Sequence, residues 1–324
     1  MTDDIFKKKH REFCDFVKTS KIQCGDLWEE VRPIFMTDLR FCADESKNPR
    51  GYFAYPGVTK PIGAADNFKY MFVSLLEKMI SKLKSVLISD DLRSKVVYER
   101  YSGCRTGYSL EDHPLFGRDK CKHNTSLYNQ WNSYVLFYNY VKELERPALL
   151  EIGAGSGIFA MLCHYELNAK YFIVDLPEMI TFSSRCIHDT LPNASILFPN
   201  EIKEGVDLGN YDFVYFLPDQ ISMIGTDLMD AAINIASFGE MSYEEVDRYF
   251  DLIHRVVKDS GYFFCSNRLK KETDFLKYKW RKSNEDIYID INEFRDEQRE
   301  FNSKVLLIDR IQRVRKTPII SPSK

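Results

Sequence analysis

The segment Leu149–Ala160 (LLEIGAGSGIFA) holds the residue types best suited to chemistry in this chain. Glycine recurs at positions 153, 155 and 157, after an apolar run that predicts a strand and before a predicted helix. Alternating glycines let the backbone turn tightly and let a ligand approach it, and a helix start offers free N–H groups. Asp175 ends the next predicted strand, where a carboxylate can hold ribose hydroxyls. The pattern therefore predicts a binding site for a nucleoside cofactor.

Two kinds of nucleoside cofactor could bind to this arrangement of glycines and acids. The dinucleotide pattern G-x-G-x-x-G needs a third glycine where this chain has Ile158. Glu151 precedes the first glycine by two residues, and its charge would repel a pyrophosphate but suit an amino group and a sulfonium. The arrangement E-x-G-x-G-x-G resembles motif I of class I methyltransferases, and the resemblance implies S-adenosylmethionine as cofactor. The residues expected to contact it here are Glu151, Gly153, Ala154, Gly155, Gly157, Asp175 and Leu176.

Composition narrows the class of protein. The chain has 324 residues, a net charge of −3 and scattered cysteines without a CxxC pair, which is typical of a globular cytoplasmic protein with reduced thiols. The charge balance argues against a nucleic-acid partner, and no run of about 18 apolar residues predicts a membrane span. Four possible zinc ligands between Cys104 and His123 lack the paired spacing of zinc sites, so we expect no metal.

The pattern of apolar residues in the sequence changes near residue 147. Residues 1–146 are expected to form a mainly helical N-terminal extension that acts as a lid and substrate region, with helices at Asn67–Leu87 and Ser126–Val141 and a polar loop at Ser102–Asn124. From there to residue 324, apolar runs alternate with helical stretches, which indicates a Rossmann-like doubly wound α/β core.

The expected strands of this core are Ala148–Ile152, Tyr171–Val174, Asp212–Leu217, Met229–Ser237, Tyr262–Cys265 and, antiparallel at the sheet edge, Val305–Arg310. One ambiguity stands, since ordinary spacing would make Ser195–Phe198 the third strand. A capping box at Ser242 begins a helix that Gly261 is expected to end.

Four further motifs add a second resemblance. They are VDLPEM (Val174–Met179), YFLPDQ (Tyr215–Gln220), NIASFGEM (Asn234–Met241) and SNR (Ser266–Arg268). Together they resemble the bacterial sugar O-methyltransferase family. The resemblance implies that a sugar hydroxyl, in a free or nucleotide-linked sugar of glycan or glycosylated-metabolite synthesis, accepts the methyl group. It also makes Asp212–Leu217 the third strand and Met229–Ser237 the fourth, which places Asp219 or Gln220 at the adenine and Ser237 beside the methyl donor.

Methyl transfer to a hydroxyl requires alignment and a base that removes the proton. Glu240, after the fourth strand, is the first candidate for this base, and His113 in the polar loop is the second. Glu240 could instead bind backbone N–H groups or the amino group of the cofactor. Asn267 and Arg268 could hydrogen-bond a sugar or anchor a loop, and Tyr128 could cover the cofactor or pack in the core.

Three functions remain open from the sequence. They are methyl transfer to a sugar, methyl transfer to another small acceptor, and a non-catalytic cofactor-binding domain that acts in an assembly. A homo-oligomer is compatible with all three.

Overall fold

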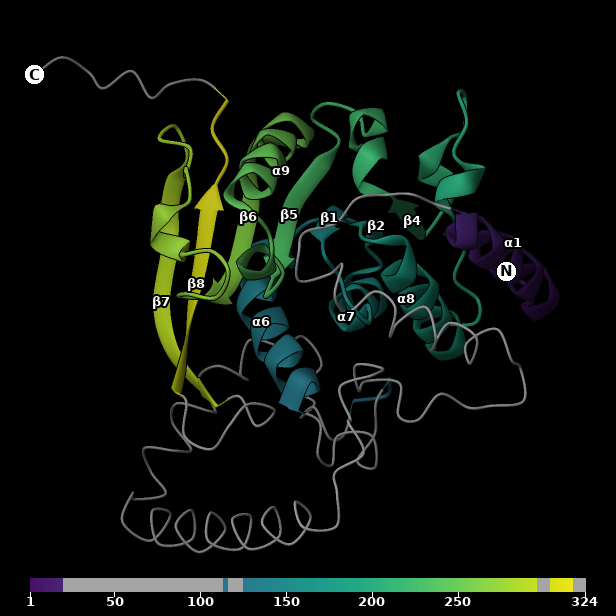
Figure 1. The fold of residues 1–324 in the computed structure, drawn as a ribbon, viewed down its shortest axis with the longest axis horizontal. Coiled ribbons are helices and arrows are strands. Elements are labelled where there is room, and N and C mark those ends of the chain that lie inside the picture. The colour runs from purple at the N-terminus through teal and green to yellow at the C-terminus, as the bar shows by residue number, and fades with distance from the viewer. Residues whose placement is uncertain (20–112, 116–124, 296–303, 317–324) are drawn as a thin grey trace, which may run out of the picture.

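The computed structural model describes residues 1–19, 113–115, 125–295 and 304–316. An eight-stranded sheet with the order β3-β4-β2-β1-β5-β6-β8-β7 forms the centre of the molecule (Figure 1). The strands are β1 (Ala148–Ile152), β2 (Lys170–Val174), β3 (Ile196–Leu197), β4 (Phe213–Phe216), β5 (Met229–Ile235), β6 (Val257–Arg268), β7 (Glu285–Arg295) and β8 (Lys304–Arg313). The α-helices are α1 (Asp3–Thr19), α6 (Thr125–Val141), α7 (Ile158–Leu167), α8 (Pro177–Thr190) and α9 (Tyr243–Val256).

Strand pairing resolves the ambiguity left by the sequence. Residues Phe213–Phe216 pair in parallel with β2, and Met229–Ile235 pair in parallel with β1. The two-residue β3 lies outside β4 at the sheet edge. The assignment that followed the family resemblance is therefore confirmed, and so is the Rossmann-like doubly wound α/β fold.

The last three strands differ in part from the expectation. The antiparallel strand β8 is confirmed, but it lies between β6 and β7, so it is not the edge strand. The edge is β7, which the sequence analysis did not identify although Ile287, Ile289 and Ile291 alternate with polar residues in it. Beyond the Arg268–Leu307 pair, the β7–β8 hairpin continues past the end of β6.

Gly261 does not end the helix that precedes it. α9 stops at Val256, and Gly261 lies inside β6. A Cβ at this glycine would come within 2.7 Å of the Asp230 carbonyl oxygen on the neighbouring strand. The glycine therefore serves close strand packing next to an irregularity in the β5–β6 pairing.

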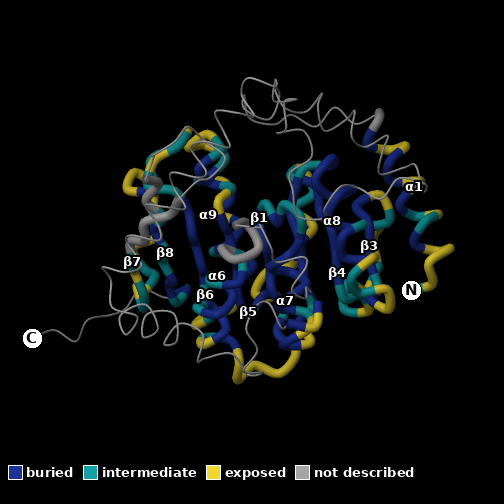
Figure 2. Tube along the Cα trace, turned by 90° about the horizontal axis from the view of Figure 1, so that it is seen from below, coloured by how far each residue is buried: buried dark blue, intermediate teal, exposed yellow. Residues whose placement is uncertain are grey.

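The helices cover both faces of the sheet and create two separate hydrophobic cores. One core joins α1, α6, α7 and α8 to one face, and the other joins α9 to the opposite face. Buried residues run along the strands between them (Figure 2). The predicted helix Ser126–Val141 is confirmed as α6, whereas Asn67–Leu87 and most of the polar loop lie outside the described residues. None of the helices in the described ranges is long and apolar enough to cross a membrane.

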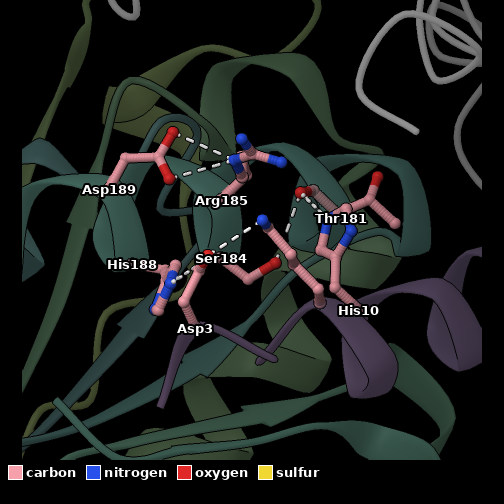
Figure 3. Close-up of polar contacts among 8 residues, drawn as sticks. Asp3, His10, Thr181, Ser184, Arg185, His188 and Asp189 are labelled. Atoms are coloured by element: carbon pink, nitrogen blue, oxygen red, sulfur yellow. Dashed lines mark hydrogen bonds and ion pairs between the residues drawn. The ribbon is translucent and has the colours of Figure 1, made fainter. Parts of the chain in front are cut away.

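α1 packs along α8 (Figure 3). The Phe6 ring stacks on the His188 ring with 3.8 Å between centroids, and His188 Nε2 lies 3.1 Å from an oxygen of Asp3. At the other end of the interface, His10 Nε2 lies 2.9 Å from the Thr181 carbonyl oxygen. The first helix is thus built into the same core as the sheet. The expected division of the chain at residue 146 stays a prediction.

Truncation of Phe6 tests how much α1 contributes to stability. Phe6 is 1% exposed, so Phe6→Ala should leave a cavity and lower the free energy of unfolding by about 3–5 kcal/mol. Ile5→Ala, on the same helix but 50% exposed, is the control and should change it far less. Urea denaturation measures both. Equal effects would show that α1 does not pack on the core as described.

Candidate functional site

The glycine-rich turn begins directly after β1. Gly153, Gly155 and Gly157 all have positive φ angles, of 72°, 58° and 77°. Side chains rarely adopt this left-handed region, so the sequence folds this way because it has glycine at each of the three positions. The Gly157 amide donates to the Ala154 carbonyl oxygen over 3.0 Å, and α7 starts at the next residue.

Ser237 lies against the first glycine of this turn. A Cβ at Gly153 would come within 2.3 Å of Ser237 Oγ, so the glycine is required for close approach as well as for its φ angle. The Ser237 hydroxyl donates to the Ile152 carbonyl oxygen over 3.0 Å. The structure therefore places Ser237 at the glycine turn, where its hydroxyl fastens the turn after β5 to the end of β1.

Two buried carboxylates lie beside the glycine turn. Asp175, at the end of β2, accepts a hydrogen bond from the Gly155 amide over 3.1 Å with one oxygen. Its other oxygen accepts from the Leu176 amide over 2.8 Å. Glu151, within β1, accepts from the Tyr171 hydroxyl over 2.9 Å. The sequence-predicted acids and glycines thus converge on one place at the carboxyl edge of the sheet.

Burial dominates the electrostatics of these two acids. It raises the pKa of Glu151 to about 8, and the Tyr171 hydrogen bond only partly opposes it. Burial likewise raises the pKa of Asp175 to about 7, against the lowering effect of backbone amides. Within the described ranges neither carboxylate has an ion-pair partner. A bound positive charge would favour ionisation of both, so this end of the sheet suits a cationic ligand.

Glu240 lies on the neighbouring turn, at the end of a 3-10 helix (Phe238–Glu240) that follows β5. Its carboxylate forms an ion pair with the Lys271 ammonium, which comes from the loop after β6. The Lys271 side chain is only 11% exposed, so the pair is largely removed from solvent. Sequence analysis missed Lys271, although its place soon after the predicted strand Tyr262–Cys265 put it at the edge of the sheet that holds the glycine turn.

Asn267 and Arg268 differ in their surroundings. The Asn267 side chain is fully buried, and its amide donates to Asn234 Oδ1 over 2.7 Å and accepts from the Gly239 amide over 3.1 Å. These contacts match the loop-anchoring alternative for Asn267. Arg268 is half-buried at the end of β6.

Other predicted site residues do not gather at the glycine turn. His113 is fully buried, and its Nε2 lies 3.0 Å from a carboxylate oxygen of Glu166. Glu166 stands near the far end of α7, eight residues or about 12 Å along the helix from Ile158. The structure therefore places His113 at the far end of α7 from the glycine turn.

The two residues predicted to contact the adenine, Asp219 and Gln220, differ in their surroundings. The Gln220 side chain accepts from the Leu217 amide over 3.0 Å and donates to the Pro199 carbonyl oxygen over 3.1 Å, so it braces the turn after β4. Asp219 is exposed on the same turn.

The Tyr128 side chain lies outside the described residues. No group of three metal-ligating side chains occurs in the part of the chain that the structure describes.

Comparisons with known proteins give distant structural similarity. No family model matches the chain, and no curated protein matches it. Among solved structures, a [4+2]-cyclase, SpnF, is 13% identical with a TM-score of 0.44, over 57% of this chain and 82% of that one. TehB from Haemophilus influenzae is 15% identical with a TM-score of 0.40, over 54% and 60%. Phosphoethanolamine N-methyltransferase 2 from Haemonchus contortus, in complex with S-adenosyl-L-methionine, is 17% identical with a TM-score of 0.33, over 43% and 28%. Similarity at this level does not assign a function.

The raised pKa of Glu151 predicts a pH-dependent stability. Folding raises this pKa from 4.5 to about 8, so the associated stability is complete below about pH 4.5 and is lost as the pH rises through about 8. Glu151→Gln is neutral at every pH and lacks this loss. Relative to wild type, its free energy of unfolding should rise by about 1.4 kcal/mol per pH unit between pH 5 and pH 8.

Urea denaturation at pH 5.5, 6.5 and 7.5 measures this difference. Glu143→Gln, in the exposed turn before β1, is the matched surface variant. Parallel stability curves for wild type and Glu151→Gln would contradict the raised pKa.

Proposed function

We propose that this chain is an S-adenosylmethionine-dependent methyltransferase that methylates a sugar hydroxyl. The observation that carries the cofactor is the pair of buried carboxylates beside the glycine turn, Glu151 and Asp175, which form no ion pair with any residue that the structure describes. The sugar acceptor rests on the sequence motifs. The cytoplasmic location and a homo-oligomer stay predictions.

The hydrogen bonds of the turn favour this cofactor over a dinucleotide. A pyrophosphate needs free backbone N–H groups, but the Gly155 amide already donates to Asp175. Two phosphate charges at the turn would also oppose ionisation of both acids, whereas a cation favours it. The sulfonium and the amino group of S-adenosylmethionine are positive, and its ribose hydroxyls can donate to a carboxylate.

Each residue then has a proposed part in binding. Asp175 receives the ribose hydroxyls, and its hydrogen bond to the Gly155 amide fixes where its carboxylate points. Glu151 supplies negative charge behind the turn, where it favours the amino and sulfonium groups. Gly153 and Ser237 shape the wall of the site. The exposed Asp219 remains the candidate for the adenine.

The acceptor end of the proposed site is the Glu240–Lys271 pair. In the proposed step, the O–H bond of the acceptor breaks and its proton passes to the Glu240 carboxylate. The acceptor oxygen forms a bond to the methyl carbon while the carbon–sulfur bond breaks. The electron pair of the carbon–sulfur bond stays on sulfur. The Lys271 ammonium stabilises negative charge on the oxygen during the transfer. When bound, S-adenosylmethionine supplies the methyl group and leaves as a neutral thioether.

Binding of S-adenosylhomocysteine tests the cofactor assignment. We expect wild type to bind it, and Asp175→Ala to bind it about 10- to 100-fold more weakly, because hydrogen bonds to a carboxylate are lost. Asp4→Ala, at an exposed aspartate of α1, is the control and should bind like wild type. Isothermal titration calorimetry measures all three, with NAD as a competing ligand. No binding by wild type, or preference for NAD, would overturn the assignment.

Methyl transfer to a panel of free and nucleotide-linked sugars tests the acceptor. We expect Glu240→Gln to lower kcat at least about 100-fold with a near-normal KM for S-adenosylmethionine, because only proton removal is lost. Glu244→Gln, an exposed glutamate four residues further on, should turn over like wild type. Full turnover by Glu240→Gln would show that Glu240 only anchors its loop. Binding of the cofactor product without methylation of any sugar would overturn the sugar acceptor alone.

A further inference from the structure

Two fully buried asparagines join three neighbouring strand ends beside the glycine turn. Asn234, near the end of β5, donates to the Ile152 carbonyl oxygen over 2.8 Å and to Ser237 Oγ over 2.5 Å. Its carbonyl oxygen accepts from the amide of Asn267, near the end of β6, over 2.7 Å. The side chains thus form a hydrogen-bonded bridge from β1 through β5 to β6, which we call the amide bridge (Asn234 and Asn267).

One end of the amide bridge holds the turn that carries Glu240. Asn267 Oδ1 accepts from the Gly239 amide over 3.1 Å, and Asn234 Oδ1 accepts from the Phe238 amide over 3.3 Å. The Gly239 carbonyl oxygen accepts from the Glu272 amide over 2.9 Å, one residue after Lys271. The two loops that supply the Glu240–Lys271 pair are therefore fixed to each other and to the amide bridge.

The other end of the amide bridge reaches the cofactor side. The Ile152 carbonyl belongs to the peptide that opens the glycine turn, and the Gly153 amide donates to the Val174 carbonyl oxygen over 2.9 Å. The next residue after Val174 is Asp175, which accepts from Gly155. Hydrogen bonds, joined by short stretches of the main chain, thus connect four strand ends from the acceptor pair to the ribose-binding acid.

A bridge of this kind specifies geometry more than it adds stability. Both amides are fully buried, so each hydrogen bond replaces one to water and contributes little net free energy, whereas its loss leaves a partner unsatisfied. Every donor and acceptor of Asn234 is in use, so its side chain has one arrangement that satisfies all its contacts. The ends of β1, β5 and β6 are thereby held in one register.

We propose that Asn234 and Asn267 are positioning residues that set the place of the Glu240–Lys271 pair relative to the glycine turn. This inference rests on the proposed methyltransferase function, because it gives the two ends of the bridge their roles. It predicts that a change at Asn267, which contacts neither the glycine turn nor Asp175 in the described hydrogen bonds, still alters cofactor binding.

Calorimetry with S-adenosylhomocysteine tests this prediction without knowledge of the acceptor. Asn267→Ala should bind about tenfold more weakly than wild type, because the turn beside Gly153 loses its support. Asn284→Ala is the matched control. Asn284 also donates to a side chain, Gln312, over 3.3 Å and accepts from a backbone amide, that of Arg315, over 3.2 Å. It lies at the opposite edge of the sheet and is only half-buried, so the variant should bind like wild type with a smaller loss of melting temperature.

A double-mutant cycle separates a bridge from two independent contacts. If the asparagines act as one unit, Asn234→Ala with Asn267→Ala should weaken binding no more than the weaker-binding single variant. If an alanine variant does not fold, the same binding measurement is made on Asn267→Ser, which keeps a small polar side chain.

The outcomes distinguish a failure of the proposed function from a failure of the positioning role. Absence of binding by wild type overturns the proposed function itself. Wild-type affinity in the folded Asn267 variant, an equal loss in Asn284→Ala, or additive effects in the cycle overturns the positioning role while the function stands. A tenfold, non-additive loss confined to the bridge supports the positioning role.

Discussion

The hydrogen bond from the Gly155 amide to the Asp175 carboxylate is the constraint on which the site depends. It forms because two parallel strands end side by side and a left-handed glycine turn directs an amide across the gap. Burial raises the pKa of this carboxyl to about 7, although the hydrogen bond itself acts to lower it. The geometry that holds the acid also creates the unbalanced charge for which a cationic ligand compensates.

This arrangement of buried acids lowers the stability of the chain when no ligand is bound. A second acid, Glu151, is buried a short way from the first, and the charge of Asp175 adds to the cost of ionising Glu151. Functional sites commonly sacrifice stability in this way, since groups arranged for a ligand are poorly arranged without it. The two hydrophobic cores on either side of the sheet supply the stability that this carboxylate pair removes.

Local patterns predicted the parts of the fold that depend on neighbouring residues. The glycine spacing fixed the turn after β1, and the apolar runs identified β1, β2 and β5, because short-range periodicity determines them. The sequence could not predict the burial of Asn267, since its partners Asn234 and Gly239 lie about 30 residues earlier in the chain. The pairing of His113 with Glu166, 53 residues apart, had no local signal either. Lys271 was missed because only the folded loops bring it to Glu240.

The docking of α1 on α8 also has a consequence for how the chain is made. His10 meets Thr181, and Asp3 meets His188, 171 and 185 residues later in the sequence. At synthesis rates of about 5–20 residues per second, the apolar side of the first helix waits roughly 10–40 s for its partner to leave the ribosome. Loop closure over such a span is slow compared with helix formation. α1 is thus synthesised well before the helix that covers it, and during that interval Phe6 and Phe13 lack the contacts that bury them in the fold.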